Sequence, residues 1–125
     1  MNSEDKVHAN WLRAELKASI QALAMPAAVQ IDLFPSGVCI ACDLTGDFEN
    51  FSRAFIAACE ESTTPSVEEV LVAIRKGIEE LAQKGDFICW DEQPIPESPG
   101  WEKLRDLAKS ALVGFGWPIE APPKR

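Results

Sequence analysis

The sequence predicts an α+β fold, with about four helices packed on a small and mainly antiparallel sheet. Apolar residues recur at helical spacing in four stretches, two short segments alternate apolar and polar residues, and a Pro-Ser-Gly turn joins those two segments. The length of 125 residues fits a single globular domain over residues 1–125. The expected order is α-β-β-α-α-β-α without an internal repeat, and residues 119–125 are expected to form a frayed tail.

The first helix is expected to begin near Ser3, whose hydroxyl can cap it. Leu12, Leu16 and Leu23 then recur at helical spacing and form one apolar stripe. Pro26 ends this helix, because the residue before a proline avoids the helical region.

A β-hairpin is expected next. Residues 29–33 alternate apolar and polar side chains, as in a half-buried strand. The turn 35–37 contains proline and glycine, and residues 38–44 are predicted to be the returning strand.

A second helix is expected after a break at Gly46, with Asp47 as its N-cap. Phe48, Phe51 and Phe55 follow at helical spacing and form its predicted buried face.

The third helix has the clearest signals. Ser66 and Glu69 match a capping box, and Lys84-Gly85 suits a helix end. Residues 86–90 are predicted to form a short strand, followed by a proline-rich linker. A last helix is expected from Ser98-Pro99, with proline in its first turn, and the glycines near residue 115 end it.

Cys39 and Cys42 form a C-x-x-C pair within the predicted returning strand. Residues three apart on a strand point to opposite faces, whereas a zinc knuckle or a redox pair needs converging sulfurs. The cysteines are therefore predicted to be reduced, structural residues of the core. A metal site with Cys59 and Cys89 stays open only if the strand prediction fails, and a redox pair is the third alternative.

No catalytic residue, cofactor site or metal site is predicted, and the chain is not expected to be an enzyme. His8 is the only histidine and is expected at the surface. The sequence lacks a Walker pattern, a dinucleotide-binding glycine motif and a calcium-loop pattern. Paired glutamates such as Glu68-Glu69 and Glu79-Glu80 are typical of solvated helix faces.

The formal net charge is −8, and the acidic residues fall in two blocks. Between residues 32 and 69 the only basic side chain is Arg53, and residues 86–102 contain no basic side chain. Such a charge opposes contact with nucleic acid and with anionic membranes, and it favours a basic protein partner. Solubility alone is the alternative explanation.

The segment from Trp90 to Trp101 is the main candidate for partner binding, because aromatic anchors among acids suit a basic protein surface. Asp47 and Glu49 in the first acidic block are weaker candidates. Both tryptophans can instead belong to the core. The acidic candidates of the segment are Asp91, Glu92 and Glu97.

These observations favour a non-catalytic acidic protein-binding module, such as an inhibitor, an immunity protein or an antitoxin for a basic partner. The alternative is a homodimeric chaperone or adaptor that uses an apolar groove, supplied by the phenylalanine helix or the alanine-rich first helix. A small metal-binding enzyme that uses the cysteines is a further alternative. The polar N-terminus predicts a cytoplasmic location.

Overall fold

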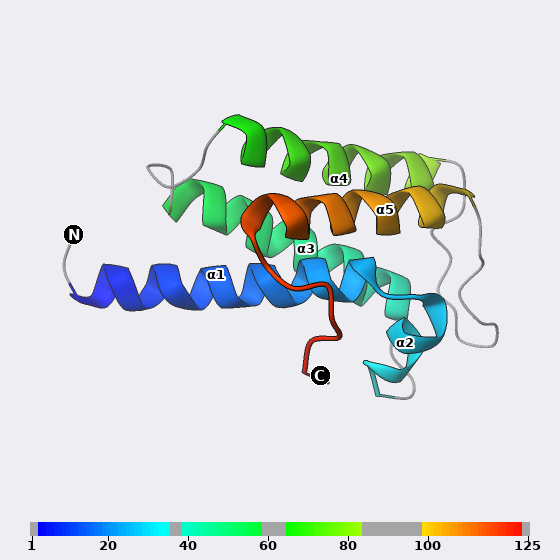
Figure 1. Cartoon of the computed structure of the whole chain (residues 1–125), viewed down its shortest axis with the longest axis horizontal. Coiled ribbons are helices and arrows are strands. Elements are labelled where there is room, and N and C mark those ends of the chain that lie inside the picture. The colour runs from blue at the N-terminus through cyan, green and yellow to red at the C-terminus, as the bar shows by residue number, and fades with distance from the viewer. Residues whose placement is uncertain (1–2, 36–38, 59–64, 84–98, 124–125) are drawn as a thin grey trace.

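The computed structural model describes residues 3–35, 39–58, 65–83 and 99–123. These residues form five helices and no strand, so the prediction of an α+β fold on a small sheet is wrong. The long helices lie side by side, and the short helix α2 lies at one end of the bundle (Figure 1). The elements are α1 (Ser3–Ala24), α2 (Ala27–Asp32), α3 (Ile40–Ala58), α4 (Pro65–Gln83) and α5 (Pro99–Phe115).

The four long helices run alternately in opposite directions (Figure 1). α1 packs extensively against α3 and α5, and α4 packs mainly against α5 and less against α3. The described residues therefore form an up-and-down four-helix bundle, in which each long helix contributes an apolar stripe to a shared interior.

The prediction for the first helix is confirmed. Leu12, Leu16, Ile20 and Leu23 are buried along one side of α1. The helix ends at Ala24, two residues before Pro26, as the restriction on the residue before a proline requires.

The predicted first strand is the short helix α2. Pro26 has extended backbone angles and forms the N-cap, and its carbonyl accepts hydrogen bonds from the amides of Val29 and Gln30, both at 3.0 Å. The amide of Leu33 closes the helix on the carbonyl of Val29. The alternating pattern was misread because Val29 and Leu33 are four residues apart, a spacing that fits one face of a helix equally well.

The predicted returning strand and the predicted break at Gly46 are also wrong, because α3 runs unbroken from Ile40 to Ala58. Its buried residues include Ile40, Leu44, Phe48 and Phe55, whose spacing of four, four and seven is helical. A glycine within a helix reduces helix propensity but does not end the helix when packing holds it. Asp47 therefore lies inside the helix and is not its N-cap.

The last two helices lie where they were predicted, and α5 begins at Pro99 as expected. α4 begins at Pro65, so Ser66 lies in its first turn and the prediction that it is the N-cap of a capping box is wrong. α5 ends at Phe115, and the residue that follows it, Gly116, has a positive φ of 77°. The amide of Gly116 donates to the Val113 carbonyl at 3.1 Å, and that of Trp117 donates to the Leu112 carbonyl at 2.9 Å. This is a Schellman end, which requires glycine at the left-handed position. The predicted strand 86–90 lies outside the described residues.

One hydrophobic core runs between the long helices. Its largest fully buried side chains are Trp101 of α5 and Phe48 and Phe55 of α3. None of the described helices has both the length and the apolar character needed to cross a membrane.

Candidate functional site

The structure separates the predicted partner-binding residues. Trp101 is 0% exposed and lies in the core, so its side chain cannot contact a partner. Asp47 and Glu49 are half-buried on α3. The other four predicted residues lie outside the described residues, and they are Trp90, Asp91, Glu92 and Glu97.

Asp47 lines a pocket of about 140 Å³, which we call the α1–α3 pocket. It lies between these two helices, the turn that follows α2, and the C-terminal tail. The carboxylates of Glu15 and Asp47 line the pocket, and most of the other lining residues are apolar. The lining residues are Glu15, Ala18, Ser19, Ala22, Leu33, Phe34, Leu44, Asp47, Pro122 and Pro123.

The antiparallel packing of α1 on α3 brings the two carboxylates to the same pocket. Glu15 and Ala18 come from α1, and Leu44 and Asp47, three residues apart, come from one side of α3. Sequence reasoning selected Asp47 but missed Glu15. Nothing in the sequence marks Glu15, because its place in the pocket depends on which helix packs against α1.

The C-terminal tail forms one wall of the pocket and is held by two contacts. Gln21 of α1 donates a hydrogen bond from Nε2 to the carbonyl of Pro118 at 3.0 Å. The rings of Phe115 and Trp117 stack with centroids 4.1 Å apart and an interplanar angle of 4°. Pro122 is buried, although the sequence predicts a frayed tail from residue 119. Figure 1 shows the tail running back across α1.

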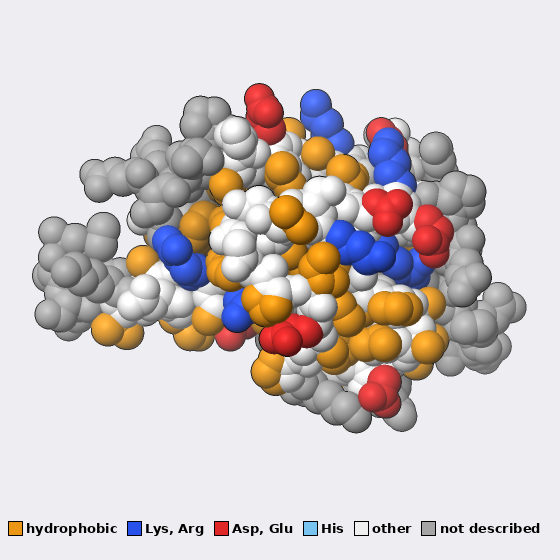
Figure 2. All heavy atoms as spheres, in the orientation of Figure 1, with side chains coloured by type: hydrophobic (Ala, Val, Ile, Leu, Met, Phe, Trp, Pro, Cys, Tyr) orange, Lys and Arg blue, Asp and Glu red, His pale blue; other side chains and the backbone are white. Residues whose placement is uncertain are grey.

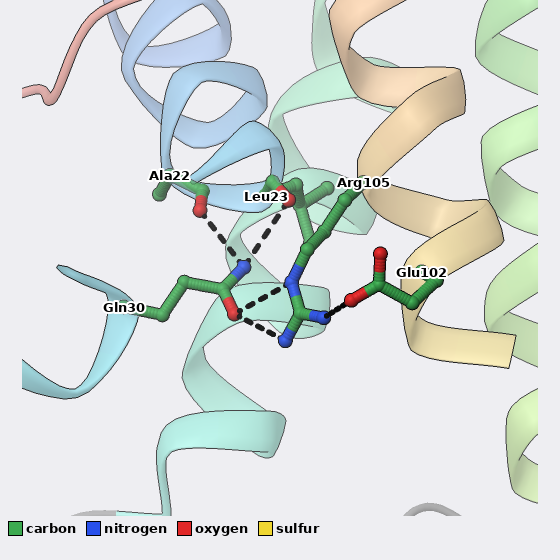
Figure 3. A network of polar contacts seen from close by, with 5 residues as sticks. All are labelled: Ala22, Leu23, Gln30, Glu102 and Arg105. Carbon is green, nitrogen blue, oxygen red and sulfur yellow. Dashed lines mark hydrogen bonds and ion pairs between the residues drawn. The ribbon is translucent and has the colours of Figure 1, made fainter. Parts of the chain in front are cut away.

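A buried polar network holds α2 in place. The turn after α2, with Leu33 and Phe34, forms another wall of the α1–α3 pocket. The side chain of Gln30 donates to the carbonyls of Ala22 and Leu23, both at 3.1 Å. Its oxygen accepts hydrogen bonds from Arg105 Nε at 3.3 Å and Nη2 at 3.1 Å (Figure 3). Gln30 is 0% exposed and Arg105 is 4% exposed, so the network fixes α2 against α1 and α5.

The segment that supplies the α3 wall of the pocket and the turn after α2 is acidic. From Pro26 to Ser52 it contains four acidic residues and no lysine or arginine. Asp43 lies one helical turn before Asp47, and Glu15 adds a carboxylate from α1. Glu15 and Asp47 both take part in interactions within the molecule, so an incoming cation would have to join or replace them. Apolar walls with carboxylates suit a cation carried on an apolar stem, such as lysine or arginine.

A second hollow, of about 470 Å³, lies along α4, and the described residues that line it all belong to this helix. Its lining includes Glu68 and Glu69 but also Lys76, so it does not present one sign of charge. The paired glutamates of α4 are exposed, in agreement with their predicted position on a solvated face. On the face shown in Figure 2, acidic and basic side chains are interspersed over α4 and α5, and apolar side chains gather near α2.

The C-x-x-C pair lies at the start of a helix and not on a strand. Cys39 immediately precedes α3, and Cys42 lies in the first turn. The amide of Cys42 donates to Cys39 Sγ at 3.4 Å. The prediction that the sulfurs of Cys39 and Cys42 point to opposite faces assumed a strand, and it is therefore wrong.

The prediction that all four cysteines are reduced is wrong as well. Cys39 is half-buried and takes part in a disulfide, whereas Cys42 carries an exposed, reduced thiol. The other half of that disulfide lies outside the described residues, as do Cys59 and Cys89. Within the described ranges, no group of three or more His, Cys, Asp or Glu side chains could hold a metal ion.

The phenylalanines of α3, a predicted alternative dimer interface, lie mostly in the interior of the bundle. Phe48 and Phe55 are buried, and Phe51 is half-buried in an edge-to-face contact with Trp11, at 5.8 Å between centroids. Trp11 is 51% exposed and stacks against His8, which is exposed as predicted.

The chain matches no protein-family model, and neither the curated proteins nor the solved structures that were searched include a similar protein.

Proposed function

We propose that this protein is a non-catalytic acidic protein-binding module, and that the α1–α3 pocket receives a lysine or arginine side chain from a basic partner. The observation that supports the proposal is the pairing of Glu15 and Asp47, from two facing helices, in a small pocket with apolar walls. An inhibitor, an immunity protein or an antitoxin would use such a site to block a basic enzyme.

The physical basis is the two-part character of a basic side chain. Its methylene stem packs on apolar walls such as Phe34 and Leu44, while its charged head stays near the carboxylates. A cation held partly out of water gains more from carboxylates than one in bulk solvent, because the effective dielectric constant is lower. Anchors of this kind dominate the binding energy of many protein interfaces.

The charge of the whole chain supports the same class of partner. A net charge of −8 raises the rate of encounter with a basic protein and disfavours acidic ones. The affinity should therefore fall as salt concentration rises.

A short uncharged peptide that contains one central arginine provides a direct test. Titration followed by ¹H–¹⁵N NMR should shift the amide signals of pocket residues such as Ala18, Phe34 and Leu44. A peptide with norleucine in place of arginine is the matched control and should produce much smaller shifts. Equal shifts with both peptides, or shifts confined to α4, would contradict the proposal.

A pair of charge-removing variants tests the carboxylates. Glu15→Gln combined with Asp47→Asn should weaken arginine-peptide binding by about tenfold or more, which corresponds to the loss of interactions with a charged group. Glu68→Gln combined with Glu69→Gln removes the same charge from α4 and should change the affinity by less than about twofold. Equal losses in both variants would point to a general charge effect and not to a binding pocket.

A homodimeric adaptor is the second candidate, and one observation favours it. Val7 is 67% exposed and Trp11 is 51% exposed, both on the N-terminal half of α1. Sedimentation of the full chain distinguishes the two functions. A dimer that Trp11→Glu dissociates would support the adaptor function, and a monomer at all concentrations would remove it.

A further inference from the structure

We propose that residues 118–123 form a strap that opens and closes over the α1–α3 pocket, with Gln21 as its latch, and that a basic side chain in the pocket holds the strap closed. The inference rests on the proposed function and deepens it, because it concerns how the same pocket admits and retains its ligand. It combines the lining of the pocket, the few contacts of these residues, and the buried side chain of Gln21.

The chain just before the strap is firmly fixed. The amides of Gly116 and Trp117 donate hydrogen bonds to carbonyls of the last turn of α5, and the Trp117 ring stacks on Phe115. Movement of the strap therefore begins after Trp117. The strap contains three prolines, at positions 118, 122 and 123, and they restrict its backbone, so it moves as a semi-rigid segment.

The strap has few contacts with the body of the protein (Figure 1). Among the described residues, its one hydrogen bond runs from Gln21 Nε2 to the carbonyl of Pro118 at 3.0 Å. Pro122 is buried, whereas the other five residues of the strap are exposed. A segment with so few buried contacts opens at a lower free energy than the helices do.

Gln21 holds the strap at a cost to the closed state. Its side chain is 4% exposed, and its amide oxygen has no hydrogen-bond partner within the part of the chain that the structure describes. A buried oxygen without a partner is unfavourable, and opening of the strap lets water reach both ends of the amide. This cost opposes closure, so the strap is easily released when the pocket is empty.

A bound side chain adds contacts that the closed strap alone provides. Pro122 and Pro123 belong to the lining of the pocket, so a methylene stem packed on their rings loses these contacts when the strap opens. A ligand that binds the closed state better shifts the equilibrium toward closure by the ratio of its two affinities. The ligand therefore orders the strap, and the strap slows release of the ligand.

Exchange of the Gln21 side-chain amide hydrogens with water, measured by ¹H–¹⁵N NMR on the full chain, reports how often the latch opens. The uncharged peptide with one central arginine is the probe, and the norleucine peptide is the matched control. With free arginine peptide at about ten times its dissociation constant, the exchange should slow by about tenfold, because binding depletes the open state. The norleucine peptide at the same concentration should slow it by less than about twofold.

Two variants release the strap from opposite sides. Gln21→Met keeps the length of the side chain but removes the donor, and Pro122→Gly removes the ring that is buried in the pocket wall. In both free variants the amide signals of the strap, at residues 119–121, should move toward the positions of an unstructured peptide. The affinity for the arginine peptide should fall by about three- to tenfold, the value of one hydrogen bond or a few apolar contacts.

Ile119→Ala is the control for these variants, since it changes an exposed side chain of the same strap and should leave the affinity unaltered. Methionine is a good helix former, so circular dichroism should show the same helix content in Gln21→Met as in the wild type.

The outcomes separate the strap from the binding function. If the arginine peptide shifts the amide signals of Ala18 and Leu44 but leaves the exchange of Gln21 unchanged, the strap proposal is overturned and the binding proposal stands. If Gln21→Met alters neither the signals of residues 119–121 nor the affinity, Gln21 is not the latch. If the peptide shifts no pocket residue, the binding proposal fails, and with it the claim that a ligand holds the strap closed.

Discussion

Gln30 bridges the end of one helix and the guanidinium group of another. Its amide nitrogen donates to the carbonyls of Ala22 and Leu23 in the last turn of α1, and its oxygen accepts from Arg105 of α5 (Figure 3). The last carbonyls of a helix have no partner within the helix, so Gln30 satisfies two of them. The positive charge of Arg105 lies near the negative end of the α1 dipole, and Glu102 accepts a further hydrogen bond from its Nη1 at 2.9 Å.

Removal of Gln30 should therefore destabilise the bundle. Gln30→Leu keeps a similar volume but removes two hydrogen bonds from the buried guanidinium, which retains Glu102, and one donor each from the carbonyls of Ala22 and Leu23. The expected loss in free energy of unfolding is about 2–4 kcal/mol. Denaturation by urea, followed by circular dichroism, measures it.

A double-mutant cycle separates this network from simple loss of packing. If the coupling is real, Gln30→Leu combined with Arg105→Met should cost at least about 1 kcal/mol less than the sum of the two single variants. Additive losses would show that the two side chains act independently.

A substitution at Gly46 tests whether α3 is continuous at this residue, as in the structure, or broken there, as the sequence predicts. A Cβ added at Gly46 would meet no atom within 4 Å, and the residue lies in the interior of α3. Gly46→Ala should therefore raise the free energy of unfolding by about 0.5–1 kcal/mol, the usual gain in a helix interior.

Gly77 in α4 is the matched control for this substitution. A Cβ there would lie 3.3 Å from Leu104 Cδ1 and 3.7 Å from Leu107 Cδ1. Gly77→Ala should consequently gain less than Gly46→Ala or lose stability. Destabilisation by Gly46→Ala would argue that the chain leaves the helix at that residue.

Trp101 and Trp11 should differ sharply in their contribution to stability. Trp101 is fully buried, so Trp101→Ala is expected to cost about 3–5 kcal/mol. Trp11 is half-exposed and contacts Phe51 only edge-to-face, so Trp11→Ala should cost less than about 1.5 kcal/mol. Thermal unfolding of both variants checks the difference. Comparable losses would contradict the burial of Trp101.

The stacked pair Phe115 and Trp117 should support the pocket through the tail. Trp117→Ala removes the stack and is expected to cost about 1 kcal/mol and to weaken arginine-peptide binding, since the tail carries Pro122 into the pocket wall. Ile119→Ala changes a side chain of the same tail that is 50% exposed, and it should leave the affinity unaltered. Equal effects of the two variants would show that the tail wall does not depend on the stack.

One signal for the buried network is present in the sequence. Arg105 follows Trp101 by four residues and precedes Ala108 by three, so it occupies the inward face of an amphipathic helix. A charged residue at such a position predicts a buried partner, but it does not name one. Gln30 is 75 residues away in the chain, and only the packing of α2 brings the two together.

The errors in the predicted fold share a cause. Residues 29–33 and 38–44 are short segments whose apolar spacing fits both a strand and a helix. Whether such a segment becomes a strand or a helix depends on the elements that it can pack against. A two-stranded hairpin is barely stable in water by itself, whereas a helix in these positions adds Leu33, Ile40 and Leu44 to the core of a bundle.

The sequence by itself determined α1, α4 and α5, because each has a long apolar stripe with proline or glycine near its ends, and such signals are local. Tertiary structure decided the helical state of residues 27–32 and 40–46, the hydrogen bonds between Gln30 and Arg105, and the placement of Glu15 and Asp47 in the lining of one pocket. Those features depend on contacts between residues far apart in the chain, and hydrophobic burial selects among local conformations that are nearly equal in free energy.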